Sequence, residues 1–103
     1  MYSDRELLEL AAKAAGVEVE WRRSAGAYYY DNPETGREEW NPRDDDGQAL
    51  RLAVKLQLEI YIDHGGVAVR THCGLKTLEK KCDAAATRLA IFRAAAAIGE
   101  TMQ

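Results

Sequence analysis

Residues 17–40 of the chain read VEVEWRRSAGAYYYDNPETGREEW, and this stretch decides much of the fold. Its first part, residues 17–22, alternates strictly between apolar and charged side chains, which is the period of a half-buried β-strand. An aromatic run at residues 27–30 and the segment 37–40 follow, each preceded by residues typical of turns. The stretch therefore predicts a three-stranded antiparallel meander.

Helices are predicted on both sides of this meander. Before it, Ser3 and Glu6 have the spacing of a capping box, and apolar residues at helical spacing predict a helix over about residues 4–15 that ends at Gly16. After it, Asp45 is placed to cap a second helix over about residues 46–57. The three carboxylates at residues 44–46 are then suited to the positive end of that helix.

A hairpin and a long helix follow. Residues 58–63 and 67–71 read as two strands joined at His64-Gly65-Gly66. We expect residues 75–82 to be an irregular edge segment, and Asp83 to cap an alanine-rich helix over about residues 84–99 that Gly99 ends. The predicted order is α-βββ-α-ββ-α, a single α+β domain of residues 1–103 in which helices pack on antiparallel sheet.

Composition limits the functions that this domain could have. Its 103 residues carry 14 basic and 17 acidic side chains, a net charge of -3, and 17 alanines that bury little area each. An acidic chain has no basic field for a phosphate backbone, which argues against direct nucleic-acid binding. The apolar runs are too short for a membrane span and Met1–Glu6 is too polar to open a signal peptide, so we expect a location in the cytoplasm.

The residues that could hold a metal lie at poor spacings. His64, His72, Cys73 and Cys82 have the right chemistry for zinc, but structural zinc ligands usually come in close pairs two to four residues apart. The acidic run at residues 44–46 lacks the glutamate that a calcium loop requires. We expect no metal, no cofactor and reduced thiols, with a small metal protein as the remote alternative.

Known catalytic motifs are also missing from the sequence. Asp63 and His64 could form an acid–base pair, but neighbouring residues at a hairpin tip more often serve the turn. We therefore expect no catalytic residues and no enzymatic activity, and a small enzyme is kept only as a remote alternative.

The aromatic stretch resembles a WW domain, a three-stranded sheet that binds proline-rich peptides. The resemblance rests on residues whose spacing is close to that of the family: Trp21, Tyr29, Tyr30, Asn32, Thr35, Trp40 and Pro42. The sequence departs from the family pattern at Pro33, where a histidine is usual, and at Pro42, which follows Trp40 one residue early. It implies that Tyr30, Thr35 and Trp40 face a ligand, and that Trp21, Tyr29 and Pro42 are structural. The alternative is a meander whose aromatic residues pair across strands and pack beneath helices.

A second resemblance covers more of the chain. Residues 40–56, followed by a strand, and the closing residues 86–96 are similar to small proteins of unknown function from bacteriophages and prophages, of the type called the phage ABA sandwich domain. This resemblance implies an origin and a fold. By analogy with phage proteins of this size, it also suggests binding to a host or phage protein.

These observations favour an acidic accessory protein that acts in the bacterial host cytoplasm by binding another protein. Aromatic side chains and concentrated charge are typical anchors of interfaces, so the expected contact residues lie on the aromatic hairpin and the acidic turn: Tyr28, Tyr30, Thr35, Trp40, Asp44, Asp45 and Asp46. The acidic turn could also imitate nucleic acid. The alanine-rich last helix could form a homodimer through close helix packing.

Overall fold

The computed structural model describes residues 2–102 and shows an α+β chain in the order α-βββ-α-βββ-α. The predicted class and order are confirmed, with one further strand after the second hairpin. The elements are α1 (Asp4–Ala15), β1 (Glu20–Arg22), β2 (Ala27–Asn32), β3 (Gly36–Glu39), α2 (Asp46–Lys55), β4 (Glu59–Asp63), β5 (Gly66–Arg70), β6 (Lys76–Glu79) and α3 (Ala84–Thr101).

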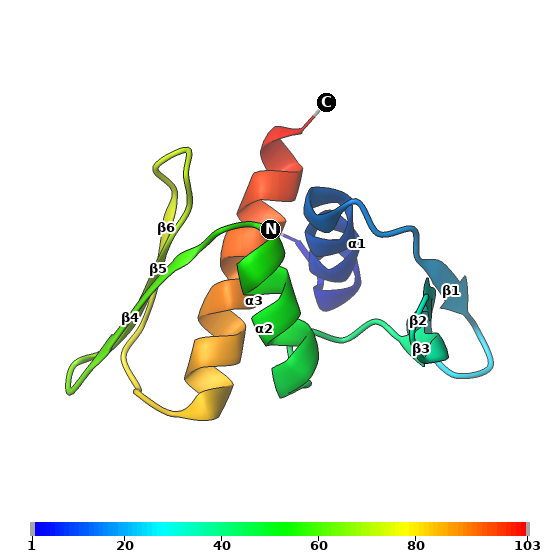
Figure 1. Ribbon diagram of the computed structural model, residues 1–103, viewed down its shortest axis with the longest axis horizontal. Coiled ribbons are helices and arrows are strands. Elements are labelled where there is room, and N and C mark those ends of the chain that lie inside the picture. The colour runs from blue at the N-terminus through cyan, green and yellow to red at the C-terminus, as the bar shows by residue number, and fades with distance from the viewer. Residues whose placement is uncertain (1, 103) are drawn as a thin grey trace.

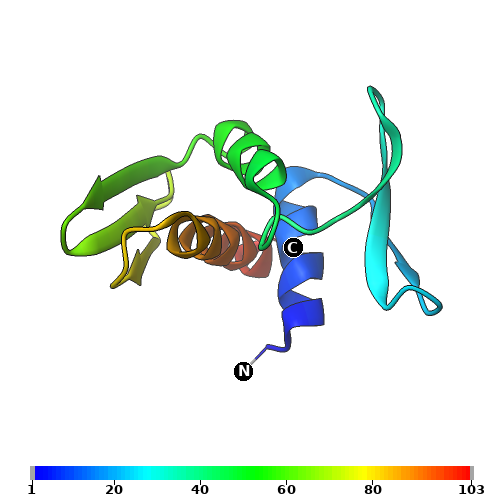
Figure 2. The same ribbon diagram turned by 90° about the horizontal axis from the view of Figure 1, so that it is seen from below.

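The six strands form two separate antiparallel sheets, ordered β1-β2-β3 and β4-β5-β6. The three helices lie between them, with one sheet at each end of the long dimension of the molecule (Figure 1). The view from below shows the same order of sheet, helices and sheet (Figure 2). Residues from both sheets and all three helices share one buried cluster, so the two ends of the chain have a common core.

Helix α3 runs through the centre of that core. Phe92, Ala90 and Ala94–Ala96 are fully or almost fully buried, and the helix packs against α1, α2, β5 and β6. Most alanines of this helix are therefore covered within the chain itself, whereas Ala84 and Ala85 at its start are exposed. The homodimer through this helix stays a prediction, and the intramolecular packing leaves fewer of its small side chains for a second copy.

The helix also continues past Gly99, where we expected it to end. A Cβ atom at this position would lie 2.0 Å from the carbonyl oxygen of Leu10 in α1. Gly99 therefore marks the closest approach of two helix backbones, and the helix runs on to Thr101. A glycine near the end of a helical pattern is typical both of a helix terminus and of a close approach by a neighbouring backbone, so its position in the sequence does not distinguish the two.

The segment of residues 75–82, for which we expected an irregular edge, contains the regular strand β6. Thr71 donates its N–H to the Leu75 carbonyl, and Gly74 adopts a φ of +89° in the turn between them. The start of β5 then comes very close to the end of β6, because a Cβ atom on Gly66 would lie 1.9 Å from the Glu79 carbonyl oxygen.

Most other boundaries agree with the sequence prediction within two or three residues. The first helix spans Asp4–Ala15 as expected, with the Ser3–Glu6 capping box formed and Gly16 left-handed at its end. The first strand is shorter than expected, since Val17 and Val19 precede β1, although both side chains still pack on the core. Within residues 2–102, no helix has the length and apolar character needed to cross a membrane.

Candidate binding surfaces

The aromatic meander turns its main aromatic face inward. Tyr28 and Trp40 are 3% and 5% exposed, and Trp40 donates its indole N–H to the Leu8 carbonyl of α1 at 3.0 Å. Helix α1 covers the face of the sheet that carries them, which favours the alternative in which these aromatic residues pack within the fold. The register explains this, since Tyr28 and Tyr30 of β2 lie on the same face as Trp40, which directly follows β3 and donates its backbone N–H to the Tyr28 carbonyl.

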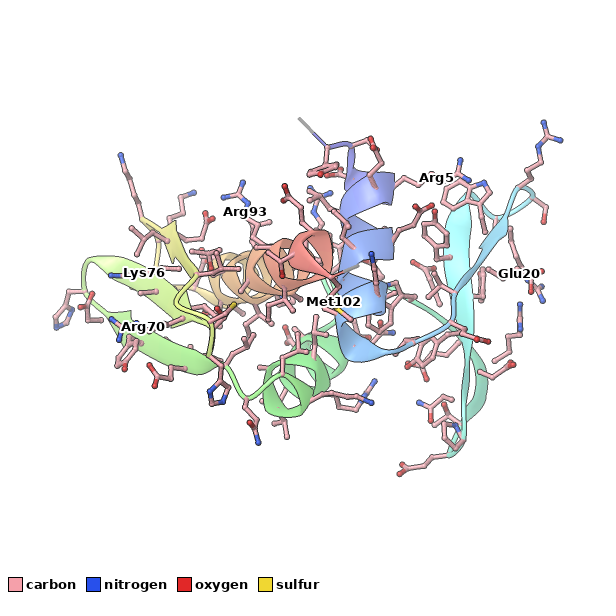
Figure 3. All side chains as sticks on the ribbon, turned by 90° about the horizontal axis from the view of Figure 1, so that it is seen from above. Arg5, Glu20, Arg70, Lys76, Arg93 and Met102 are labelled. Carbon is pink, nitrogen blue, oxygen red and sulfur yellow. The ribbon has the colours of Figure 1, made fainter. Side chains whose placement is uncertain are left out.

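Tyr28 is also held at its hydroxyl. It donates to a carboxylate oxygen of Glu9 and accepts from Arg5 Nε at 3.2 Å. Burial, followed by the hydrogen bond to Glu9, raises the pKa of Tyr28. Arg5 reaches from α1 towards the first sheet (Figure 3), where its guanidinium carbon lies 4.0 Å from the Trp21 ring centroid. These contacts attach the meander to α1 and hold the Tyr28 and Trp21 rings against that helix.

Tyr30 and Thr35 meet at the carboxylate of Glu38. The Tyr30 hydroxyl donates to it at 3.2 Å and the Thr35 hydroxyl at 2.7 Å, while Asn32 and Gln48 donate side-chain N–H groups at 3.2 and 3.1 Å. The Thr35 hydrogen bond, with smaller contributions from the other three donors, lowers the pKa of Glu38 against partial desolvation that raises it. A carboxylate with four donors is a structural connector between β2, β3 and α2.

Beside this connector lies a small apolar cleft of about 110 Å³. Its walls include Tyr30, Trp40 and Leu52, with Arg51 and Lys55 of α2 also lining it. Tyr30 and Trp40 meet edge to face, with ring centroids 5.5 Å apart and ring planes at 83°. The cleft is large enough for one aliphatic side chain, and the perpendicular rings leave no flat aromatic groove.

The three aspartates of the acidic turn all serve the start of α2. Asp45 is the N-cap and accepts the Gln48 N–H at 2.9 Å, whereas Asp44 accepts from the Asn41 side chain at 3.1 Å. Asp46 pairs with Arg88 of α3 at 2.5 Å. The turn therefore joins three parts of the fold, and its exposed carboxylates are a local acidic patch with structural partners.

The histidines and cysteines do not come together. His72 and Cys73 lie in the turn between β5 and β6, His64 lies in the turn after β4, and Cys82 precedes α3. Across residues 2–102, no three side chains of the histidine, cysteine, aspartate and glutamate types are grouped where they could hold a metal ion. Cys73 is exposed and lies 3.2 Å from the Thr71 hydroxyl, and this contact lowers the pKa of its thiol.

Exposed apolar side chains gather instead around the second sheet, where sequence reasoning did not place a site. Tyr61 is 55% exposed, Ile62 59% and Leu78 64%, and on α2 Leu50 and Val54 are also exposed. Tyr61, Ala68 and Leu78 stand directly opposite one another across β4, β5 and β6, so they form one apolar row. The signal available in the sequence is that Tyr61 interrupts the polar face of an otherwise alternating strand.

A charged row borders this apolar row. Glu59, Arg70 and Lys76 are also cross-strand neighbours on β4, β5 and β6. Each lies two residues along its strand from the member of the apolar row, and therefore on the same face of the sheet. Arg70 and Lys76 lie at the end of the molecule opposite Glu20 of the first sheet (Figure 3). The inner face of the sheet packs on α3, where Thr77 donates to the Ala90 carbonyl at 2.7 Å. The outer face is the one that carries both rows.

Comparison with known proteins gives no family model, no curated protein and no solved structure that matches this chain.

Proposed function

We propose that this chain is a non-catalytic accessory protein that acts by binding another protein through the outer face of its second sheet. The observation that carries this proposal is the apolar row of Tyr61, Ala68 and Leu78, whose two large members are more than half exposed. Apolar groups gathered on one face mark interaction sites, and tyrosine is a frequent anchor residue in interfaces.

The neighbouring charges suit such an interface. The row formed by Glu59, Arg70 and Lys76 lies beside the apolar row, which gives the surface an apolar centre with a polar border. Charges at a border contribute mainly to orientation and to the association rate. The surface therefore has the composition of a protein contact.

The wider setting of the proposal is that of a phage or prophage accessory protein. The partner would then be a host or phage protein, met in the bacterial cytoplasm. Support for this part comes from the sequence resemblance of residues 40–56 and 86–96 to small phage proteins.

The alternative of a proline-rich peptide in a WW-like groove has less support. A polyproline helix needs aromatic faces that are open and roughly parallel. Trp40 is 5% exposed, and its ring stands at 83° to that of Tyr30. A titration with a proline-rich peptide, followed by tryptophan fluorescence, is expected to leave the emission unchanged.

A capture experiment from bacterial lysate tests the proposed surface. Wild type, the double variant Tyr61→Ser with Leu78→Ser, and the triple variant Asp44→Asn, Asp45→Asn and Asp46→Asn are compared as baits. Asparagine keeps the helix cap of Asp45 while removing the charge, so the triple variant is a folded control.

We expect the triple variant to retain the partner of the wild type and the double variant to lose it. A matched double variant, Leu50→Ser with Val54→Ser, removes exposed apolar area from α2 and is expected to retain the partner. Melting temperatures confirm that each bait is folded. A partner that stays bound to the Tyr61→Ser and Leu78→Ser bait would contradict the proposed surface.

A further inference from the structure

Strand β4 is an open edge of the second sheet. The Thr71 N–H bonds to Leu75, so the backbone groups of Thr71 point towards β6, and those of Arg70 and Ala68 point towards β4. The register pairs these two residues with Glu59 and Tyr61. The backbone N–H and C=O groups of Ile60 and Ile62 therefore point away from the sheet, and no hydrogen bond from the described residues reaches them.

The other sheet edges are protected. At the edge of β3, the Gln48 side chain donates to the Glu39 carbonyl at 2.6 Å and accepts the Asn41 N–H at 2.7 Å. Strand β1 has three residues, and β6 has four, with Lys76 in it and Lys80 just beyond it. Short edges, lysines and covering groups are the usual means of preventing further strand pairing.

Strand β4 has none of these protections. It is five residues long, with the sequence Glu-Ile-Tyr-Ile-Asp, and it contains no lysine, proline or glycine. Helix α3 packs along β5 and β6 rather than along β4. Side chains of β4 are exposed on both faces of the sheet, since Tyr61 on the outer face and Ile62 on the inner face are each more than half exposed. An edge of this length that no helix or side chain within residues 2–102 covers, and that is apolar at three of its five positions, is a template for another strand.

The charges on β4 indicate what kind of strand would pair with it. Glu59 and Asp63 lie two residues on either side of Tyr61, so the three side chains share the outer face. Residues that stand directly opposite in an antiparallel pair interact, and opposite charges favour pairing while like charges oppose it. An incoming strand with basic residues at the two flanking positions and an apolar residue between them would match this pattern.

We propose that β4 receives an extended, basic segment of the partner protein as a fourth strand of the second sheet. The segment carries Lys or Arg opposite Glu59 and Asp63, and its backbone completes the hydrogen bonds of Ile60 and Ile62. This inference rests on the proposed function, because it specifies how the partner is held at the border of the same outer face.

A second copy of this chain fits the edge less well. In the two-fold antiparallel register with the largest overlap of the two strands, which pairs Ile60 of one copy with Ile62 of the other, Glu59 of each copy faces Asp63 of the other. Two pairs of like charges then stand directly opposite, which is destabilising. A basic strand relieves this repulsion in the same register.

The test uses the capped peptide Thr-Lys-Val-Tyr-Val-Lys-Thr as the probe. In the matching register its two lysines face Asp63 and Glu59, and its valine backbones meet Ile62 and Ile60. Two control peptides carry either Glu in place of both lysines or N-methyl groups on both valine amides. Calorimetry measures affinity, and amide hydrogen exchange reports on Ile60 and Ile62.

We expect the basic peptide to bind at least ten times more tightly than either control and to slow exchange at Ile60 and Ile62 at least tenfold. Failure of the basic peptide to bind overturns the proposal. Binding that leaves exchange at these two amides unchanged also overturns it. Protection of both amides in the free protein that rises with its concentration would assign the edge to a second copy and overturn it as well.

Two protein variants make the test specific. Ile62→Pro removes one outward donor without removing a bond to β5, and proline is tolerated at such edge positions. Glu59→Lys with Asp63→Asn reverses the charge preference, and asparagine keeps the side-chain acceptor that bonds the Gly65 N–H. The first variant is expected to lose the basic peptide, and the second to prefer the acidic one.

The captured partner separates this inference from the proposed function. If the Ile62→Pro bait retains the partner while the Tyr61→Ser and Leu78→Ser bait loses it, the outer face binds the partner and the strand pairing is wrong. If both baits retain the partner, the proposed surface itself is wrong.

Discussion

Glu38 connects more of the fold than its position on an exposed meander suggests. Four side chains donate hydrogen bonds to its carboxylate, and Arg51 lies 3.5 Å away. The four hydrogen bonds, that of Thr35 above all, stabilise the ionised form, so the pKa of Glu38 in the folded chain lies below its usual value of 4.5. In sequence, Glu38 and Glu39 form a plain acidic pair that reads as solvated surface. Their roles differ because it is the side chain of Glu38 that accepts hydrogen bonds from Thr35 and Gln48.

This lowered pKa predicts a pH dependence of stability. Because the unfolded chain takes up a proton on Glu38 at a higher pH than the folded chain, the stabilisation is complete above about pH 4.5 and is lost as the pH falls through the folded-state pKa. Thr35→Val removes the largest cause of the lowering. The variant is expected to lose less stability than wild type between pH 7 and pH 3.5, as measured by urea unfolding.

The NMR titration of Glu38 gives the direct control for this prediction. The pKa of its carboxyl should be higher in Thr35→Val than in wild type. An unchanged pKa would show that the hydroxyl of Thr35 does not stabilise the carboxylate.

Gly99 gives a prediction about packing at a single position. In Gly99→Ala the new methyl group would lie 2.0 Å from the Leu10 carbonyl oxygen, and a backbone atom cannot rotate away. The cost of overpacking exceeds the gain in helix propensity of about 1 kcal/mol, so a net loss of roughly 2 kcal/mol is expected. Thermal unfolding measures it.

Gly47→Ala is the matched control for that substitution. Gly47 lies in the first turn of α2, where a Cβ atom would meet only side-chain atoms, at 3.2 Å or more. Its melting temperature is expected to stay constant or to rise slightly. Equal losses in the two variants would mean that the α1–α3 contact has no special role.

At the scale of the elements, the acidic turn is mainly a helix start. Asp45→Ala removes the acceptor for the Gln48 N–H and is expected to lower stability by about 1 kcal/mol, whereas Asp45→Asn keeps the cap and is expected to cost little. Chemical denaturation of the two variants measures the difference. Similar losses in both would indicate that charge, and not capping, matters at this position.

The sequence predicts the type of most elements because periodicity and caps are local. The capping box of Ser3 and Glu6 and the cap at Asp83 are confirmed, as is the meander. The face that each element buries depends on long-range packing. Tyr28 and Trp40 form an aromatic pattern that suits either a ligand groove or a core, and only the position of α1 decides between them.

The candidate site could be predicted only in part for the same reason. Tyr30 and Thr35 do lie together, but through Glu38 and within the chain. The exposed row at Tyr61 and Leu78 requires the register of β4, β5 and β6, which no local pattern of residues 75–82 indicated. The register and the exposure of a strand depend on its neighbours, and so does the existence of β6, which forms as an edge of β5.

On the scale of the whole molecule, the first sheet is attached to the helices mainly through side chains. The Trp40 indole donates to the Leu8 carbonyl, and the Tyr28 hydroxyl bonds to Arg5 and Glu9. The outer face of the first sheet carries the ion pairs of Arg37. The second sheet instead packs directly on α3. We therefore expect the two ends of the molecule to differ in local stability.

Hydrogen exchange tests that difference. Amides of β5 and α3 are expected to exchange only through global unfolding, and those of β2 and β3 through a lower-energy opening. Trp40→Phe removes the bond to Leu8 and should speed exchange in the meander at least tenfold, with a smaller effect at β5. Uniform acceleration across both sheets would show that the chain opens as one unit.

The close approach of Gly66 to the Glu79 carbonyl also bears on how the chain can vary during evolution. Any side chain at position 66 would enter the space of a neighbouring backbone, at a φ of +135° that only glycine adopts easily. Alanines of α3 can exchange for other small residues over time, and surface charges can drift. Diverged descendants of this sequence should therefore keep glycine at this turn after most of their recognisable composition has changed.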